Sequence, residues 1–482
     1  MQESQLMQIF QCLTRQDRRN LRSFVRSPFH NTREDVVRLY EYLDNSMDSA
    51  ERNMNKESIF DAVFNAHTEG ATKVSFDAKK LNYTCSFLDK VIRDYLIINQ
   101  LQNDSWDSDF LLQKAFILRG QFKLATKVLT TAQQTLESQQ IQNASAHYHS
   151  FKLHHALYDL NSSRERTDDT SLQESADTFT AFAVAEVLRQ GCSMLTQQAF
   201  SKRNYNLPLL EVALKIASDT IREDSFGKGR GSVACKAYYH AYQSLSNEGD
   251  TVTQKFHFQE LRHILETEWQ QFPAAEMHGL YVMAINFCIK KMNRGEQPYE
   301  REVLEIYKIG LTNRLLFENN QLSPYTYKNT MMAALKVGEM DWAKAFLDEY
   351  KPFLPPQDRD MIYKYNKALY FFRINDYTAA MILLQTVNLR EVLFNLDTRR
   401  LLARIYFELN EWTALDSLIE SSKIYLHRQK GIGYHREMYL NFFKILEMLL
   451  KADPKKRLLL SGMIAETKYL AERVWLLEKL DL

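Results

Sequence analysis

The chain has 482 residues with 61 basic and 60 acidic side chains, so its formal net charge is +1. This balance excludes an attraction of the whole molecule to nucleic acid or to an anionic membrane, although local charged patches can still form. The chain holds only 14 glycines and 9 prolines, less than half their average share of about 12%, which argues against a turn-rich all-β fold. Since 45% of the residues are hydrophobic, the chain can bury a large core and is not expected to be disordered.

The cysteines and the N-terminal residues bear on the cellular compartment. Five cysteines lie far apart, and no two form a CxxC pair, which favours reduced, packed thiols over a disulfide framework or a zinc site. Residues 1–4 lack the basic and apolar regions that begin a signal peptide. The uncharged run 377–389 is too short to span a bilayer. We therefore expect a cytoplasmic protein without a membrane partner.

Apolar residues recur at helical spacing along nearly the whole chain, beginning with Val37, Leu39, Tyr40 and Leu43. Turn-forming residues at 27–31 separate two such segments. No convincing β-hairpin signal is present. The pattern predicts an all-α protein of roughly twenty helices joined by short loops.

The N-terminal residues form a predicted helical domain, 1–104, whose boundary we place at the polar residues 103–105. One predicted helix in it carries five arginines on a single face: Arg15, Arg18, Arg19, Arg22 and Arg26. Such a stripe can contact phosphates, so a regulator that contacts nucleic acid through this helix is one alternative function. An ordinary solvated face, partly neutralised by nearby acids, is the interpretation we favour, and nucleic acid is not the expected partner.

Residues 105–482 form the second predicted domain, and its C-terminal third repeats one pattern in three segments: 334–340, 371–377 and 406–412. Each segment ends a helix and then places Gly338, Asn375 or Asn410 at a tight turn, where these residues adopt a left-handed backbone at low cost. The turns are 37 and 35 residues apart, which is the length of one helix–turn–helix repeat. A fourth match surrounds Gly120.

This pattern resembles the tetratricopeptide repeat. The small residues that let paired helices approach closely in that family match Ala343, Ala368, Ala380 and Ala403. Met331 and Leu415 depart from the pattern, because both are large where the family has small residues. The resemblance implies a right-handed α-α superhelix, a solenoid of helical hairpins, after an N-terminal helical segment; a non-repeating helical bundle is the alternative. Residues 20–29 and 80–96 resemble the start of uncharacterised bacterial helical-repeat proteins, which imply no function.

In tetratricopeptide arrays the first helix of each repeat lines the concave surface, and the inner face listed by this resemblance carries five basic and two acidic side chains. The residues expected to bind a partner there are Lys328, Asn329, Lys336, Tyr365, Asn366, Arg373, Arg400 and Arg404. Cations beside amide donors bind carboxylates through charge-assisted hydrogen bonds. Asp397 and Leu401 depart from the carboxylate-binding pattern of the family, since they stand where it has cations. The leading function is therefore a non-enzymatic scaffold that binds a protein or peptide segment, and an acidic segment is the expected ligand.

No catalytic, cofactor-binding or metal-binding residue is predicted. The histidines between His147 and His155 lack the spacing of three or four residues that chelation on one helix needs. The glycine-rich residues 226–232 could hold a phosphate at a helix start, but a loop between helices explains them better. An enzyme whose site is not visible in the sequence is the second alternative function.

The C-terminal residues, about 455–480, are predicted to form one last helix. Trp475, Leu476 and Leu480 leave more apolar surface than one helix face can bury. This helix could therefore mediate self-association.

Overall fold

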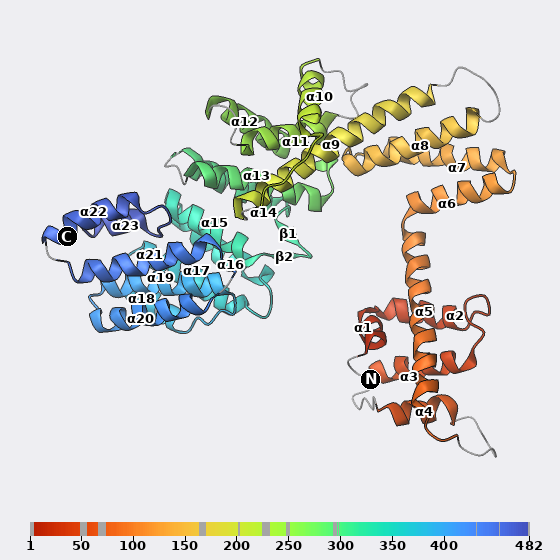
Figure 1. Cartoon of the computed structure of the whole chain (residues 1–482), viewed down its shortest axis with the longest axis horizontal. Coiled ribbons are helices and arrows are strands. Elements are labelled where there is room, and N and C mark those ends of the chain that lie inside the picture. The colour runs from red at the N-terminus through yellow and green to blue at the C-terminus, as the bar shows by residue number, and fades with distance from the viewer. Residues whose placement is uncertain are drawn as a thin grey trace. The chain divides into compact units, whose positions relative to one another are not determined.

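The computed structural model describes residues 4–48, 55–65, 74–162, 170–200, 203–223, 232–246, 251–292, 296, 298–429, 431–452 and 454–480. These ranges hold 23 α-helices and a single two-stranded sheet (Figure 1). The predicted all-α class is therefore confirmed. Among the described helices, none combines the length and the apolar character that crossing a membrane requires.

The chain divides into two compact units. Unit 1 consists of Met1–Glu137 with Asp159–Arg166, and unit 2 consists of Ser138–Tyr158 with Thr167–Leu482. The boundary predicted at residue 104 falls where one helix ends and the next begins, because Asp104 follows the last residue of α5 and its carboxylate accepts hydrogen bonds from the first amides of α6. A domain division at that residue stays a prediction.

Unit 1 contains α1 (Gln5–Cys12), α2 (Arg15–Val25), α3 (Glu34–Asp48), α4 (Lys56–Phe64), α5 (Ala78–Asn103), α6 (Ser105–Leu118) and α7 (Phe122–Ser138). Helix α2 begins with a capping box, in which Thr14 and Asp17 each accept a hydrogen bond from the other's backbone amide. The first five helices bury one apolar cluster whose fully buried members include Phe10, Tyr40 and Phe60.

The arginine stripe of unit 1 lies on α2. Arg18 and Arg22 both pair with Asp44 of α3, at 2.9 and 2.6 Å. Arg26 pairs with Glu41 of the same helix α3. Arg15 and Arg19 are exposed. Acids of α3 thus neutralise part of the stripe, which agrees with the interpretation of this face as an ordinary solvated surface.

The first helices of unit 2 are α8 (Ala144–Ser162), α9 (Ser171–Phe200), α10 (Leu210–Glu223), α11 (Ser232–Leu245), α12 (Thr251–Thr267), α13 (Ala274–Met292) and α14 (Pro298–Thr312). A short 3₁₀ turn, η2 (Trp269–Gln271), follows α12. Helix α9 packs against α10 and α11, and α11 packs against α12 and α13. These helices share one apolar core with the repeats that follow, which extends from Ala144 to Ile405.

A short hairpin, β1 (Phe317–Glu318) and β2 (Gln321–Leu322), connects α14 to the repeats. The sequence analysis predicted no hairpin, and that expectation was wrong here. The two residues between the strands, Asn319 and Asn320, have φ values of 49° and 61°. Asparagine tolerates this left-handed backbone, which two-residue hairpin turns require. The pair Asn-Asn was therefore the local signal.

The three predicted repeats comprise α15 (Pro324–Val337), α16 (Met340–Tyr350), η3 (Lys351–Phe353), α17 (Arg359–Arg373), α18 (Tyr377–Gln385), α19 (Val392–Glu408) and α20 (Trp412–Arg428). They are followed by α21 (Tyr434–Leu450), α22 (Pro454–Glu466) and α23 (Arg473–Glu478). Consecutive helices from α15 to α21 pack against each other (Figure 1). Their arrangement is a series of helical hairpins.

The turn residues of the repeats have the predicted left-handed backbone: Gly120 (φ 71°), Gly338 (φ 90°), Asn375 (φ 62°) and Asn410 (φ 59°). After each of the last three, the next amide donates to a carbonyl five residues earlier, at 3.0, 2.9 and 2.8 Å. These bonds satisfy carbonyl groups that the helix end leaves free. The left-handed turns are confirmed.

The small residues predicted at helix crossings are fully buried: Ala343, Ala368, Ala380 and Ala403. Met331 and Leu415, which depart from the small-residue pattern, are fully buried as well. The register that we assigned to the three repeats therefore places the expected residues in the core.

The C-terminal residues differ from the single predicted helix. Helix α22 ends at Glu466, and α23 begins only at Arg473. The break lets the chain turn, so that Trp475 and Leu476 are buried in the same apolar cluster as Phe442 of α21. Val474 of the same helix α23 is 70% exposed. Self-association through this region stays a prediction, and Trp475 and Leu476 no longer support it.

Candidate functional site

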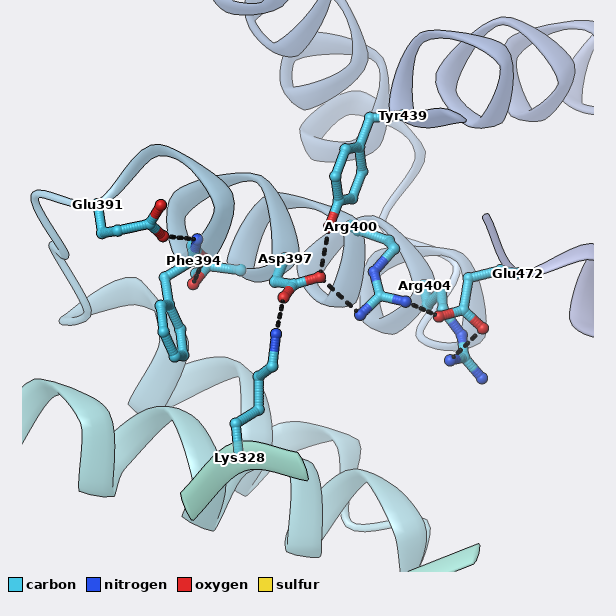
Figure 2. Close-up of polar contacts among 9 residues, drawn as sticks. Lys328, Glu391, Phe394, Asp397, Arg400, Arg404, Tyr439 and Glu472 are labelled. Atoms are coloured by element: carbon cyan, nitrogen blue, oxygen red, sulfur yellow. Dashed lines mark hydrogen bonds and ion pairs between the residues drawn. The ribbon is translucent and has the colours of Figure 1, made fainter. Parts of the chain in front are cut away.

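The predicted inner face lies on α15, α17 and α19, and two of its cations, Lys328 and Arg400, meet at Asp397 (Figure 2). Helix α19 begins after Glu391, whose carboxylate accepts a hydrogen bond from the amide of Phe394 at 2.8 Å. Asp397, Arg400 and Arg404 then follow at spacings of three and four residues, which places them on one helix face. We call the six residues that meet there the Asp397 cluster: Lys328, Asp397, Arg400, Arg404, Tyr439 and Glu472.

Asp397 is bound by three donors from three helices. Lys328 of α15 approaches one carboxylate oxygen at 2.6 Å. Tyr439 of α21 donates its hydroxyl to the other oxygen at 2.6 Å, and Arg400 approaches that same oxygen at 3.0 Å. The carboxylate thus joins helices that lie far apart in the sequence.

Glu472 supplies the second carboxylate of the cluster. Arg400 binds one of its oxygens, and Arg404 binds the other at 2.8 Å. Glu472 precedes α23 and has a left-handed backbone, with φ 56°, which costs a non-glycine residue roughly 1–2 kcal/mol. The two ion pairs therefore hold a strained residue in place.

The charged groups of this cluster are little exposed to solvent, since none of their side chains is more than 18% exposed. Burial alone raises the pKa of Asp397, but Arg400 and Lys328 outweigh it and hold that pKa below its ordinary value. Burial likewise opposes the charge of Arg400, yet Glu472 and Asp397 raise its pKa well above the ordinary value. For Arg404 burial prevails over Glu472, and its pKa is lowered. Each of the three cations pairs with at least one of the two carboxylates, and the cluster keeps a formal net charge of +1.

The structure divides the eight predicted partner-binding residues into two groups. Lys328, Arg400 and Arg404 belong to the Asp397 cluster, and Tyr365 and Asn366 are fully buried. Asn366 donates its side-chain amide to the carbonyl of Ile362 at 2.8 Å. These five side chains are engaged or covered by the chain itself.

The other three predicted residues are more accessible. The side chain of Lys336 is 50% exposed and pairs with Glu300 of α14 at 2.8 Å. Arg373 is exposed, and its Nε donates to the carbonyl of Leu335 at 3.1 Å. Asn329 is half-buried. Since Leu335 precedes Lys336, this hydrogen bond brings Arg373 of α17 beside Lys336 of α15.

Aromatic side chains fill the space between the inner helices. Phe394 of α19 lies 5.0 Å from Tyr325 of α15 and 5.8 Å from Tyr365 of α17, measured between ring centroids. The ammonium of Lys328 lies over the Phe394 ring at 4.9 Å. An inner face with excess positive charge was predicted. In the structure, two acids from outside that face pair with three of its cations: Glu300 pairs with Lys336, and Glu472 pairs with Arg400 and Arg404.

Glu472 and Tyr439 were not identified from the sequence, because both lie outside the repeat pattern and neither is near Arg400 in the chain. A second set of contacts also joins α19 to the C-terminal residues. Glu408 of α19 accepts a hydrogen bond from the indole of Trp475 at 2.8 Å and pairs with Lys479 at 2.9 Å. The acids and cations of α19 are therefore matched by the residues around α23.

Three other features of the sequence are its potential metal ligands, its cysteines and the glycine-rich residues 226–232. In the described parts of the chain, no group of three histidine, cysteine or acidic residues is arranged to hold a metal ion. Cys192, Cys235 and Cys288 are buried and unpaired. The glycine-rich residues 226–232 lie outside the described residues, apart from Ser232, which begins α11.

Three comparisons complete the description of the site. The chain matches no family model, no curated protein and no solved structure.

Proposed function

We propose that this chain is a non-enzymatic scaffold, a solenoid of tetratricopeptide-like hairpins that binds an acidic segment of a partner protein. The contact lies at Lys336 and Arg373, the two accessible cations of the predicted inner face. The observation that supports the proposal is the hydrogen bond that Nε of Arg373 donates to the carbonyl of Leu335, the residue before Lys336 on the neighbouring predicted repeat. A right-handed superhelix would repeat this arrangement along the array.

The free donors of these residues suit a carboxylate ligand. Only the Nε of Arg373 is engaged by the described residues, so its two terminal nitrogens are available for a bidentate contact. Lys336 is half-exposed and shares its ammonium with Glu300. An ammonium has three donors, so it can bind a partner carboxylate while it stays paired with Glu300, whose side chain is only 19% exposed.

The chain itself provides a precedent for this chemistry. Arg400 and Arg404, one helical turn apart on α19, hold both oxygens of the Glu472 carboxylate. The same helix face that the resemblance assigns to ligand binding thus binds an acid that arrives from a distant segment.

The test is a titration of the full chain with a fluorescent glutamate-rich peptide, followed by anisotropy. We expect binding that weakens as salt is raised and is lost in the double variant Lys336→Glu, Arg373→Glu. The matched control is Lys123→Glu, Lys344→Glu, which makes the same charge change at two other exposed lysines.

Two results would contradict the proposal. Equal weakening by the test and control variants would show that only the net charge matters. Absence of binding to the acidic peptide at low salt, with a lysine-rich peptide binding instead, would reverse the sign of the partner.

A further inference from the structure

Four helices of unit 2 surround a cavity of about 660 Å³. Its wall is formed by the start of α8, by one face of α9, and by side chains of α11 and α13, which include Tyr148, Phe182, Tyr238 and Glu276. This volume lies within the range of small-molecule sites in proteins, roughly 300–1,000 Å³. The cavity shares no residue with the Asp397 cluster or with Lys336 and Arg373.

Glu276 holds a negative charge at the wall of this cavity. One carboxylate oxygen accepts the side-chain amide of Asn143 at 2.6 Å, and the other accepts the hydroxyl of Tyr238 at 2.8 Å. Both donors are neutral, and no ion pair to Glu276 is formed within the part of the chain that the structure describes. The two hydrogen bonds fix the orientation of the carboxylate and leave its charge without a cation in contact.

The arginine of the cavity interacts with Glu276 only from a distance, because its ion pair is formed with another carboxylate. Arg189 binds Glu186, three residues before it on α9, through two hydrogen bonds of 2.6 and 2.8 Å. This contact lowers the pKa of Glu186 and keeps its carboxylate ionised. With Glu186 and Arg189 compensating each other, the charge of Glu276 gives the lining a net charge of −1.

Aromatic rings also line the cavity. Tyr148 of α8 and Phe182 of α9 lie 5.2 Å apart between ring centroids, and Met283 of α13 also contributes to the lining. Aromatic faces attract cations and also cover apolar groups. The cavity therefore offers an anionic end and an aromatic surface.

Gly279 keeps the cavity open. It lies within α13, one turn after Glu276, and a Cβ atom built on it would have no atom within 4 Å. Glycine inside a helix lowers the stability of the helix by roughly 1 kcal/mol relative to alanine. No neighbouring atom would exclude a larger side chain at this position. The missing side chain leaves open space on the same helix, three residues after Glu276, in the lining of the cavity.

We propose that this cavity binds a small organic cation, an ammonium group carried on an apolar or aromatic body. The ammonium pairs with Glu276, and the body lies against Tyr148 and Phe182. The geometry of Gly279 admits the ligand between them.

The test uses three ligands of one shape and different charge: 2-phenylethylamine, 2-phenylethanol and 3-phenylpropionate. Their binding to the full chain is measured by saturation-transfer NMR at millimolar concentration. We expect the amine to bind about tenfold or more tightly than the alcohol, since a bond to a charged group is the stronger one, and the acid to bind least.

Two variants locate the site. Glu276→Gln keeps the size of the side chain and removes its charge, so the preference for the amine over the alcohol should disappear. Gly279→Leu fills the open space and should abolish binding of all three ligands. The controls are Glu211→Gln at an exposed position of α10 and Gly462→Leu in α22, where a Cβ likewise meets no atom within 4 Å.

Three outcomes would overturn the proposal. Binding of the amine no better than the alcohol rejects the cationic class, and amine binding that survives Gly279→Leu rejects the location. No binding of the amine to the native chain rejects the site altogether. Circular dichroism of each variant verifies that it is folded.

Discussion

Glu472 is the residue on which the inner face of the repeats depends most directly. Its backbone is left-handed, and its carboxylate is the counter-charge of both Arg400 and Arg404. A buried ion pair adds little net stability compared with an apolar contact, but removing one partner leaves the other charge buried without compensation. The arginines of α19 are therefore bound to this segment and are not free inner-face cations.

Glu472→Ala is expected to destabilise the protein by about 3–5 kcal/mol, because the buried guanidinium of Arg404 loses its carboxylate and that of Arg400 keeps only Asp397. Chemical denaturation followed by circular dichroism measures the change. The control is Glu478→Ala, which removes an exposed acid of α23 and should change stability by less than about 0.5 kcal/mol. Equal effects of the two variants would show that the Glu472 pairs contribute nothing specific.

A buried histidine pair makes the stability depend on pH. The Nδ1 atoms of His240 and His257 lie 2.9 Å apart, so one ring donates a hydrogen bond to the other. Burial, followed by the neighbouring His257 and Lys236, lowers the pKa of His240 to about 4. An unfolded histidine has a pKa near 6.5, so the unfolded chain takes up the proton first.

Stability should accordingly be complete above about pH 6.5 and fall by about 3 kcal/mol as the pH drops from 6.5 to 4. His240→Gln removes the titrating ring and should reduce this loss. Melting temperatures across that pH range test the effect, with His263→Gln, an exposed histidine of α12, as the control. An unchanged pH profile in His240→Gln would reject the assignment.

The helical hairpins depend on small residues at their crossings and on left-handed turns between their helices. Ala380 of α18 is fully buried, whereas Ala379, its neighbour on the same helix, is half-buried. Close packing leaves no room for additional methylene groups at a fully buried crossing. The two alanines therefore differ in their tolerance of a larger side chain.

Ala380→Leu should overpack the crossing and lower the free energy of unfolding by about 1–3 kcal/mol. Ala379→Leu makes the same substitution one position away and should cost less. Denaturant midpoints of the two variants provide the comparison. If Ala380→Leu leaves the midpoint unchanged, the assigned repeat register is wrong.

The whole molecule contains separate hydrophobic cores. The cluster of unit 1 is made only of residues between Leu6 and Tyr95, whereas the clusters of unit 2 begin at Ala144. Compact units with their own cores unfold as separate cooperative transitions when few contacts join them.

Phe10→Ala should destabilise unit 1 by about 3–5 kcal/mol, because it removes a fully buried ring. In differential scanning calorimetry of the full chain, we expect one transition to move to a lower temperature and the other to stay in place. A single transition that shifts as a whole would show that the two cores unfold together.

Local interactions explain which features of this protein could be predicted from its amino acids. The helical class follows from apolar periodicity, and the turns at Gly338, Asn375 and Asn410 follow from the backbone preference of those residues. The burial of Ala343 and Ala380 follows from the repeat pattern, because the pattern predicts which face of each helix packs against its neighbour. The hairpin at Asn319 and Asn320 had a local signal as well.

Contacts between distant segments required the folded structure. The sequence predicted Arg400 and Arg404 to be surface cations. Their ion-pair partner, Glu472, lies about 70 residues later in the chain, so no nearby residue indicates the pairing. The cavity beside Gly279 likewise joins residues from 143 to 283. Charge compensation and cavity formation depend on which helices meet, and that depends on packing across the whole core rather than on the preference of any short segment.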